Sequence, residues 1–161
     1  MTTRVPPSLG DRGQGWVALQ FLLLGVLGLV GWWDRGGWPD EVRAWLSFVG
    51  AVSVLCGIGV AVAGARGLGS ALTAAPAPLP GASLRSAGVY GVVRHPIYAG
   101  LVQIALGVAL VTGPWALAPA LALCVVLDLK RRVEEAFLVR TYPDYAEYQT
   151  QVRRALGPGL W

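Results

Sequence analysis

The chain has 161 residues, the size of one domain, and 55% of them are hydrophobic while only 14% are charged. A mean hydropathy of +0.56 and a charged fraction well below the soluble norm of about a quarter exclude an ordinary soluble domain and favour an integral membrane protein. The net charge of +4 does not indicate nucleic-acid binding, because the basic residues are spread over several segments instead of being gathered on one face.

The cysteines do not predict a metal site. Cys56 and Cys124 both lie inside apolar runs, and neither has a second thiol or a histidine at metal-ligand spacing. We expect both to act as small hydrophobic side chains, and we expect no metal cofactor.

Two uncharged runs in the first half of the chain predict membrane-spanning helices. Residues 16–33 would form about 27 Å of helix, with tryptophans at both ends as in an aromatic belt. Residues 44–65 form the second run, and its glycine, alanine and serine residues favour close packing on a neighbouring helix.

The next segment, residues 66–94, is rich in turn residues, with alanine and proline alternating over 75–78. Two interpretations remain open for its proline-rich part, a flexible linker or a functional loop. Because residues 81–94 lead directly into a polar stretch, we expect at least these to be ordered over a ligand.

The apolar run 97–129 would be about 50 Å long as one helix, which is too long for a simple span. Gly113 and Pro114 divide it near the middle. It therefore predicts a tight hairpin of two helices, 97–112 and 114–129. Both ends of such a hairpin return to the same side, so His95 is expected near Lys130.

After residue 129 the sequence becomes polar and predicts helices outside the membrane. One helix is expected to continue to about residue 140, and Pro143 interrupts it. A second is expected over 144–156, with Asp144 as N-cap and an apolar face at helical spacing. That face comprises Tyr145, Tyr148, Val152 and Leu156.

These elements predict a single all-α membrane domain over residues 1–161, with four transmembrane helices and C-terminal helices outside the bilayer. In this topology eleven basic residues lie on the side of the termini and two on the other side. The positive-inside rule then places the termini, the 66–94 loop and the C-terminal helices in the cytoplasm, with the protein in the plasma (cytoplasmic) membrane.

Polar chemistry is concentrated in the stretch 88–100, where a loop meets an apolar run. It holds the only histidine, His95, between Arg94 and Pro96, with Tyr98 three residues later. Proline disfavours the helical region for the residue before it and favours the first position of a helix, so His95 should be extended while Pro96 opens the next helix. The His95 ring and the Arg94 guanidinium then lie at a helix N-terminus, which attracts anions.

Together with Arg132-Val133-Glu134-Glu135 and the tail 142–148, this stretch resembles the isoprenylcysteine carboxyl methyltransferase family and its relatives, the phospholipid N-methyltransferases. The resemblance covers residues 79–161, about half of the chain, with two separated motifs in the right order. It implies an S-adenosylmethionine-dependent methyltransferase, an enzyme of the EC 2.1.1 class.

S-adenosylmethionine presents a carboxylate, an ammonium, a sulfonium, a ribose diol and an adenine, and the polar groups expected at the cytosolic face match these in kind. The resemblance implies a cofactor region over about 81–98 and 130–156. The cofactor-binding residues it implies are Ala82, Ser83, Leu84, Arg85, Tyr90, His95, Pro96, Ile97, Tyr98 and Glu134.

The basic residue one helical turn before the family's acid is linked to the methyl-accepting substrate, and that position falls on Lys130. Arg131 is the second candidate for substrate binding, and Arg131 and Arg132 are both alternatives to Lys130 at this position. The prenylcysteine enzymes have arginine where this chain has Lys130, and lysine provides a point charge instead of a bidentate fork. The chemical class of the methyl acceptor therefore stays open.

His95 and Glu135 are the candidate catalytic residues. A carboxylate or thiolate acceptor attacks a sulfonium methyl directly, whereas an amine must lose a proton, which either residue would accept. Each of these residues also has a structural alternative. His95 would cap a helix, and Glu134 and Glu135 would be a solvated pair in which Glu135 forms an ion pair with Arg131. The neighbouring arginines would bind anionic headgroups.

The sequence thus predicts methyl transfer to a lipophilic acceptor that enters from the bilayer, most directly a carboxylate or thiol. The alternatives are a phospholipid or amine N-methyltransferase, and a non-catalytic membrane module that binds a lipid or a partner. The expected partners are the lipophilic substrate and membrane lipids, without nucleic acid.

Overall fold

The computed structural model describes residues 5–157, and every regular element in that range is a helix. The predicted all-α class is therefore confirmed. The main helices are α1 (Gln14–Trp33), α2 (Asp40–Leu68), α3 (Pro96–Thr112), α4 (Leu117–Thr141) and the short α5 (Tyr145–Gln151). Three short 3-10 helices lie between them: η1 (Gly69–Ala71), η2 (Gly88–Gly91) and η3 (Pro114–Ala116).

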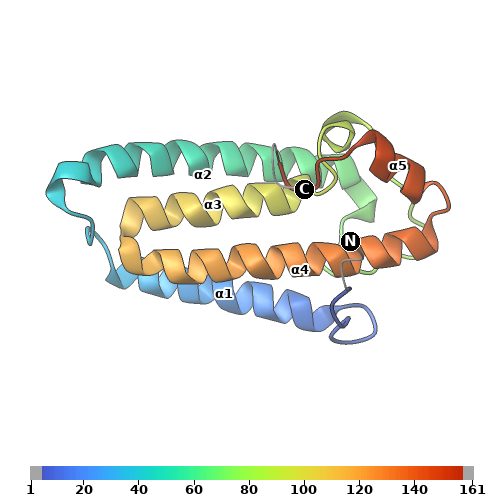
Figure 1. Ribbon diagram of the computed structural model, residues 1–161, viewed down its shortest axis with the longest axis horizontal. Coiled ribbons are helices and arrows are strands. Elements are labelled where there is room, and N and C mark those ends of the chain that lie inside the picture. The colour runs from blue at the N-terminus through green and yellow to red at the C-terminus, as the bar shows by residue number, and fades with distance from the viewer. Residues whose placement is uncertain (1–4, 158–161) are drawn as a thin grey trace.

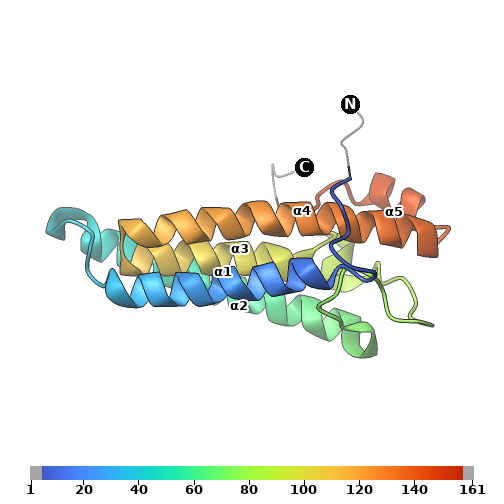
Figure 2. The ribbon, with the colours of Figure 1, turned by 90° about the horizontal axis from the view of Figure 1, so that it is seen from below.

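The four long helices run alongside one another, and the 72–95 loop and α5 gather at one end of the bundle (Figure 1). Helix α3 is central, because it packs on α1, α2 and α4, whereas α2 packs mainly on α3 (Figure 2). A Cβ added at Gly50 would stand 2.6 Å from the Gly107 carbonyl oxygen, and one at Gly57 would stand 2.6 Å from that of Gly100. These glycines confirm the close packing predicted for the second apolar run.

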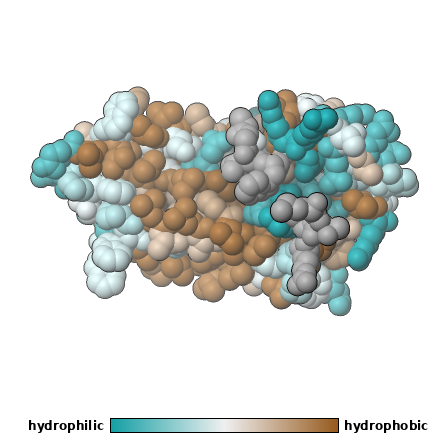
Figure 3. All heavy atoms as spheres, viewed as in Figure 1, coloured by the Kyte–Doolittle hydropathy of each residue, from teal (hydrophilic) through white to brown (hydrophobic). Residues whose placement is uncertain are grey.

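Two segments, Gln14–Trp33 and Asp40–Ala71, are long and apolar enough to cross a membrane, while α3 is apolar but shorter. Their large apolar side chains are widely exposed, and Figure 3 shows hydrophobic residues over the middle of the bundle and hydrophilic ones toward its ends. Such a surface suits lipid more than water. The count of four spans stays a prediction.

Two helix boundaries differ from the expected ones. Helix α2 begins at Asp40 because Pro39 precedes it and two acids occupy its first turn, where negative charge stabilises a helix N-terminus. The expected helix 114–129 begins as the 3-10 turn η3, and α4 then continues without a break to Thr141. No glycine or proline follows Pro119 within α4 to interrupt it. The last apolar segment and the first polar helix are thus one element.

The predicted helix 144–156 is wrong beyond Gln151, where α5 ends. The following residues instead lie against the stretch before α3: the backbone N–H of Arg94 donates to the Arg154 carbonyl at 2.9 Å, and that of His95 to Ala155 at 3.0 Å. These bonds fix a non-helical segment that a continued helix would not provide. The residues predicted for the apolar face are all buried: Tyr145, Tyr148, Val152 and Leu156.

Candidate active site

A cavity of about 420 Å³ lies where the beginnings of α1 and α3 meet the ends of α2 and the polar half of α4. The 71–85 segment and the residues around α5 complete its wall. This volume lies within the range of about 300–1,000 Å³ that is typical of small-molecule sites. The cavity therefore joins the apolar bundle to the polar end of the molecule.

Pro96 opens α3 as the sequence predicts. The preceding His95 has a non-helical backbone (φ −125°, ψ 65°), as proline favours, but it does not adopt the extended conformation that the sequence predicts. The buried ring stacks on Tyr98 with a centroid separation of 5.6 Å. Nε2 lies 3.0 Å from Oε1 of Glu135, and Nδ1 lies 3.8 Å from Oε1 of Glu134. Because an ionised carboxylate only accepts, Nε2 carries the donated proton and Nδ1 is turned toward Glu134.

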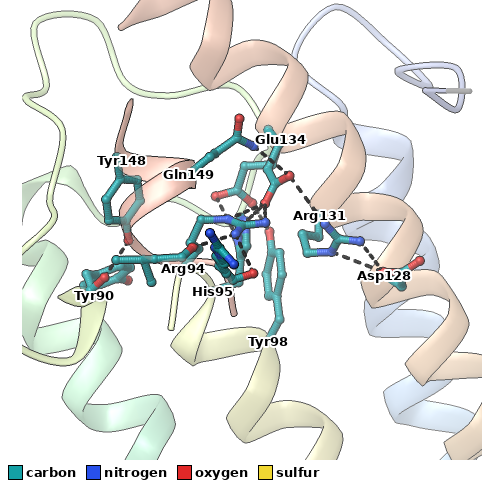
Figure 4. A network of polar contacts seen from close by, with 12 residues as sticks. Tyr90, Arg94, His95, Tyr98, Asp128, Arg131, Glu134, Tyr148 and Gln149 are labelled. Carbon is teal, nitrogen blue, oxygen red and sulfur yellow. Dashed lines mark hydrogen bonds and ion pairs between the residues drawn. The ribbon is translucent and has the colours of Figure 1, made fainter. Parts of the chain in front are cut away.

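The Glu135 carboxylate is the centre of a polar network that ties α3, α4 and α5 together. Figure 4 labels its partners Arg94, His95, Arg131 and Gln149. Besides His95, the carboxylate accepts from Arg94 Nε at 3.0 Å, from Gln149 Nε2 at 3.1 Å and from Arg131 Nη1 at 3.4 Å. Burial raises the pKa of Glu135, but the hydrogen bond from His95 and the charges of His95, Arg94 and Arg131 outweigh it and lower the pKa to about 2. Glu135 therefore remains ionised and holds its neighbours in place.

Arg94 extends this network to the end of the described chain. Its Nη1 donates to the carbonyl oxygens of Val152 at 2.7 Å and Arg153 at 2.9 Å. The same residue pairs with Glu135 through Nη2 at 3.0 Å. One guanidinium thus joins the non-helical segment after α5 to α4.

Glu134 and Lys130 face the cavity from successive turns of α4. The Tyr98 hydroxyl donates a short hydrogen bond to Oε2 of Glu134. Lys130 is almost fully buried; its Nζ lies 2.6 Å from Oε1 of Gln20 on α1 and 5.0 Å from the centroid of the Tyr98 ring. Burial lowers the pKa of Lys130, and the negative charge of Glu134 opposes that change.

Tyrosine hydroxyls fix the loop wall of the cavity. Tyr142 donates to the Ala82 carbonyl at 2.8 Å, and Tyr148 donates to the Tyr90 carbonyl at 2.6 Å. Burial raises the pKa of Tyr148 to about 12, so this hydroxyl keeps its proton at neutral pH. Tyr145 also lines the cavity, yet its buried hydroxyl has no hydrogen-bond partner within residues 5–157.

Most of the residues predicted for the cofactor lie in the cavity wall, and Pro96 is the exception, because it is buried against Gly64 of α2. The cavity-lining residues among those predicted for the cofactor are Ala82, Ser83, Leu84, Arg85, Tyr90, His95, Ile97, Tyr98 and Glu134.

The other predicted residues divide between the cavity and its surroundings. Lys130 lines the cavity, whereas Glu135 and Arg131 lie outside its lining. The Arg131 guanidinium instead donates to Asp128 at 2.6 Å and 3.1 Å and reaches Glu135. Neighbouring helix residues point about 100° apart, which explains why Glu134 faces the cavity and Glu135 does not.

Sequence reasoning missed Gln20 and left Tyr145 as a packing residue. A usable signal for Gln20 was present, because its side chain is the one amide within the apolar run 16–33. A polar residue inside a membrane segment is costly and commonly functional.

None of the curated proteins matches the chain. A family model does match, over residues 45–145, and it describes a phospholipid methyltransferase. The matched region contains every predicted site residue. Helix α1, and with it Gln20, lies outside it. Because the match spans more than half of the chain, the protein belongs to the phospholipid methyltransferase family of membrane methyltransferases.

Proposed function

We propose that this protein transfers the methyl group of S-adenosylmethionine to a lipophilic acceptor that reaches the cavity from the bilayer. The observation that carries the proposal is the cavity of about 420 Å³, in which His95, Tyr98, Lys130 and Glu134 meet the apolar ends of the helices. Family membership supplies the reaction class, and the cavity offers one place where that reaction can occur.

The cavity wall has the chemical groups that this cofactor needs. Arg85 offers a cation for the carboxylate, and Glu134 with the ring of Tyr98 offers an anion and a π face for the ammonium and sulfonium. Leu84 and Leu138 offer apolar surface for the adenine. When bound, the cofactor supplies an electrophilic methyl group.

The chain's own residues orient the reactants and exclude water. The Tyr98 hydroxyl holds Glu134, and Glu135 holds His95, so both groups that face the cavity are fixed before a ligand arrives. A carboxylate or thiolate acceptor then needs alignment and desolvation more than a base. The buried ammonium of Lys130 is placed to hold an anionic acceptor in this wall.

The route of the acceptor follows from the packing of the bundle. Helices α1 and α2 both contribute to the cavity, through Gln20 and Leu68, but each packs on α3 more than on the other. We place the acceptor's apolar chain between these two helices. The charge asymmetry supports a site at the cytosolic surface of the plasma membrane.

A phospholipid amine is the second candidate acceptor, and the description of the matching family favours it. An amine must lose a proton, and His95 Nδ1 is the better acceptor because Glu135, with its pKa of about 2, binds a proton weakly. In this version His95 is the base and Glu135 is the residue that positions it.

The first test is calorimetric titration of the detergent-purified protein with S-adenosylhomocysteine. We expect saturable binding to the parent, binding at least tenfold weaker for Glu134→Gln, and parent-like binding for the exposed control Glu147→Gln. A folded parent without saturable binding would refute the proposed cofactor and favour a non-catalytic membrane module.

The second test identifies the acceptor class. The protein is incubated with methyl-labelled S-adenosylmethionine and a membrane lipid extract, and the labelled lipids are treated with base. A methyl ester releases labelled methanol, whereas a methylated amine keeps its label. Release of the label supports the carboxylate acceptor, and a base-stable headgroup label supports the phospholipid amine.

A further inference from the structure

A second pocket lies against the polar half of α4, apart from the cavity described above. Its volume is about 920 Å³, and among the described residues the two linings have only Arg94 in common. Glu135 lies between the two spaces, because it lines this pocket while its carboxylate holds His95, which lines the cavity. The pocket is therefore a separate space behind the Glu135 network.

The described lining of this pocket is rich in positive charge, and we call it the basic pocket. It holds five guanidinium groups, the carboxylate of Glu135 and three apolar side chains. The arginines are Arg94, Arg131, Arg132, Arg140 and Arg153, and the apolar residues are Val5, Ala136 and Val139. Asp128 lies outside the lining and pairs with Arg131 and Arg132, so five cations face two anions. The sequence shows only that Arg131 and Arg132 are neighbours, and the fold brings the other three arginines to them.

Two of the five arginines keep all of their donors. Arg140 lies in the last turn of α4 and Arg153 in the segment after α5, and both are exposed. Within residues 5–157 neither guanidinium makes a hydrogen bond or an ion pair. Both oxygens of the Glu135 carboxylate are already engaged by other donors. The two free guanidinium groups therefore each offer a planar fork of N–H donors to an external anion.

The position of the basic pocket points to the membrane as the source of that anion. The apolar run of α4 ends at residue 129, so Arg131 and Arg132 lie about 3–5 Å beyond it along the helix. The polar headgroup layer of a bilayer is roughly 5–8 Å thick on each side of the hydrocarbon core. Apolar side chains remain exposed at this end of the molecule, as they do where a protein meets lipid: Val5, Leu9, Leu72, Val92 and Val139. The phosphate of a neighbouring lipid therefore lies at the depth of the pocket.

We infer that the basic pocket binds the phosphate group of an anionic phospholipid from the surrounding bilayer. Arg140 and Arg153 donate to the phosphate oxygens, and Arg132 adds positive charge beside them. A guanidinium suits this role, because its fork binds two phosphate oxygens at once. The bound phosphate joins the segment after α5, through Arg153, to α4, through Arg140.

This lipid is not the methyl acceptor. Its headgroup lies behind Glu135 and outside the cavity, so no reacting group of the lipid reaches the proposed cofactor. The inference therefore goes beyond the proposed function and does not depend on methyl transfer.

The test counts the lipids bound to the protein in mild non-ionic detergent by native mass spectrometry. The protein is titrated with a short-chain phosphatidylglycerol, with phosphatidylcholine of the same chains, and with glycerol phosphate, which has no chains. We expect phosphatidylglycerol to bind saturably and roughly tenfold more tightly than phosphatidylcholine, whose choline cation offsets its phosphate. Glycerol phosphate should bind more weakly than phosphatidylglycerol. Bound phosphatidylglycerol should also raise the melting temperature, because it binds only the folded state.

Two variants and a matched control isolate the pocket. The double variant Arg140→Gln/Arg153→Gln removes both free cations without breaking an ion pair of the described residues, and should bind phosphatidylglycerol roughly 5- to 30-fold more weakly. Val139→Glu places a carboxylate at an exposed position of the pocket wall and should weaken binding by a similar factor. The control Arg12→Gln/Arg66→Gln removes two exposed arginines from the same end of the molecule, outside both linings, and should bind like the parent.

The inference is overturned if phosphatidylcholine binds as tightly as phosphatidylglycerol, or if the double variant or Val139→Glu binds phosphatidylglycerol as the parent does. An equal loss of affinity in the control would also overturn it, because the loss would then reflect net charge and not the pocket. Glycerol phosphate that binds as tightly as the lipid would assign the pocket to a soluble phosphate compound. Titration with S-adenosylhomocysteine tests the proposed function separately, since neither Arg140 nor Arg153 lines the cavity.

Discussion

Replacing Glu135 by glutamine should destabilise the protein strongly while preserving the shape of the side chain. The carboxylate accepts from Arg94, His95, Arg131 and Gln149, and its side chain is only 14% exposed. Its pKa falls from 4.5 to about 2. At about 1.4 kcal/mol for each tenfold change in acidity, the free energy of unfolding at neutral pH should fall by about 3 kcal/mol. Removing one member of a buried ion pair typically costs a similar amount, about 3–5 kcal/mol.

The lowered pKa of Glu135 also predicts how the free energy of unfolding depends on pH. A carboxylate whose pKa is lowered by folding stabilises the folded state above its unfolded pKa of 4.5, and that contribution is lost as the pH falls toward about 2. Urea titrations in mild detergent, followed by circular dichroism, should show the parent and Glu135→Gln converging over this range. The exposed Glu41 of α2 provides the control, because Glu41→Gln should change stability by about 0.5 kcal/mol or less. Parallel pH curves for the parent and Glu135→Gln, or a loss below about 1 kcal/mol at neutral pH, would refute the reasoning.

Two further pairs of variants test packing and hydrogen bonding. Gly57→Ala brings a Cβ to 2.6 Å from the Gly100 carbonyl oxygen and should destabilise the protein by about 1–3 kcal/mol. Gly59→Ala, with open space around it, should be neutral or stabilising. Thermal melts in detergent compare the two variants, and equal melting temperatures would contradict the packing. Tyr148→Phe loses a 2.6 Å hydrogen bond and should cost about 1 kcal/mol in urea titrations, whereas Tyr145→Phe removes a hydroxyl that has no partner in the described chain and should cost nothing. A larger loss for Tyr145→Phe would show that its hydroxyl is bonded in the protein.

The features that the sequence could predict depend on local chemistry. Pro96 determines where α3 begins, and the Gly113-Pro114 pair determines where the hairpin turns, because a proline restricts its own backbone and that of the residue before it. The 100° step between adjacent helix positions separates Glu134 from Glu135 without any knowledge of the tertiary structure. The resemblance to the family implied the cofactor residues, and nearly all of them line the cavity.

The features that the sequence could not predict depend on partners far along the chain. Periodicity favours a helix through Leu156, but the backbone N–H groups of Arg94 and His95 pair with the carbonyls of Arg154 and Ala155, and this pairing decides the conformation. The contact of Gln20 with Lys130 likewise joins α1 to α4. No local pattern states which partner a buried polar group will find.

The segment after α5 also makes the position of His95 depend on the far end of the described chain. A chain that ends before residue 155 contains His95, Glu134 and all the long helices, but the backbone N–H of His95 lacks the Ala155 carbonyl that it binds in the structure. The packing of the bundle and the position of its one histidine therefore depend on different parts of the chain.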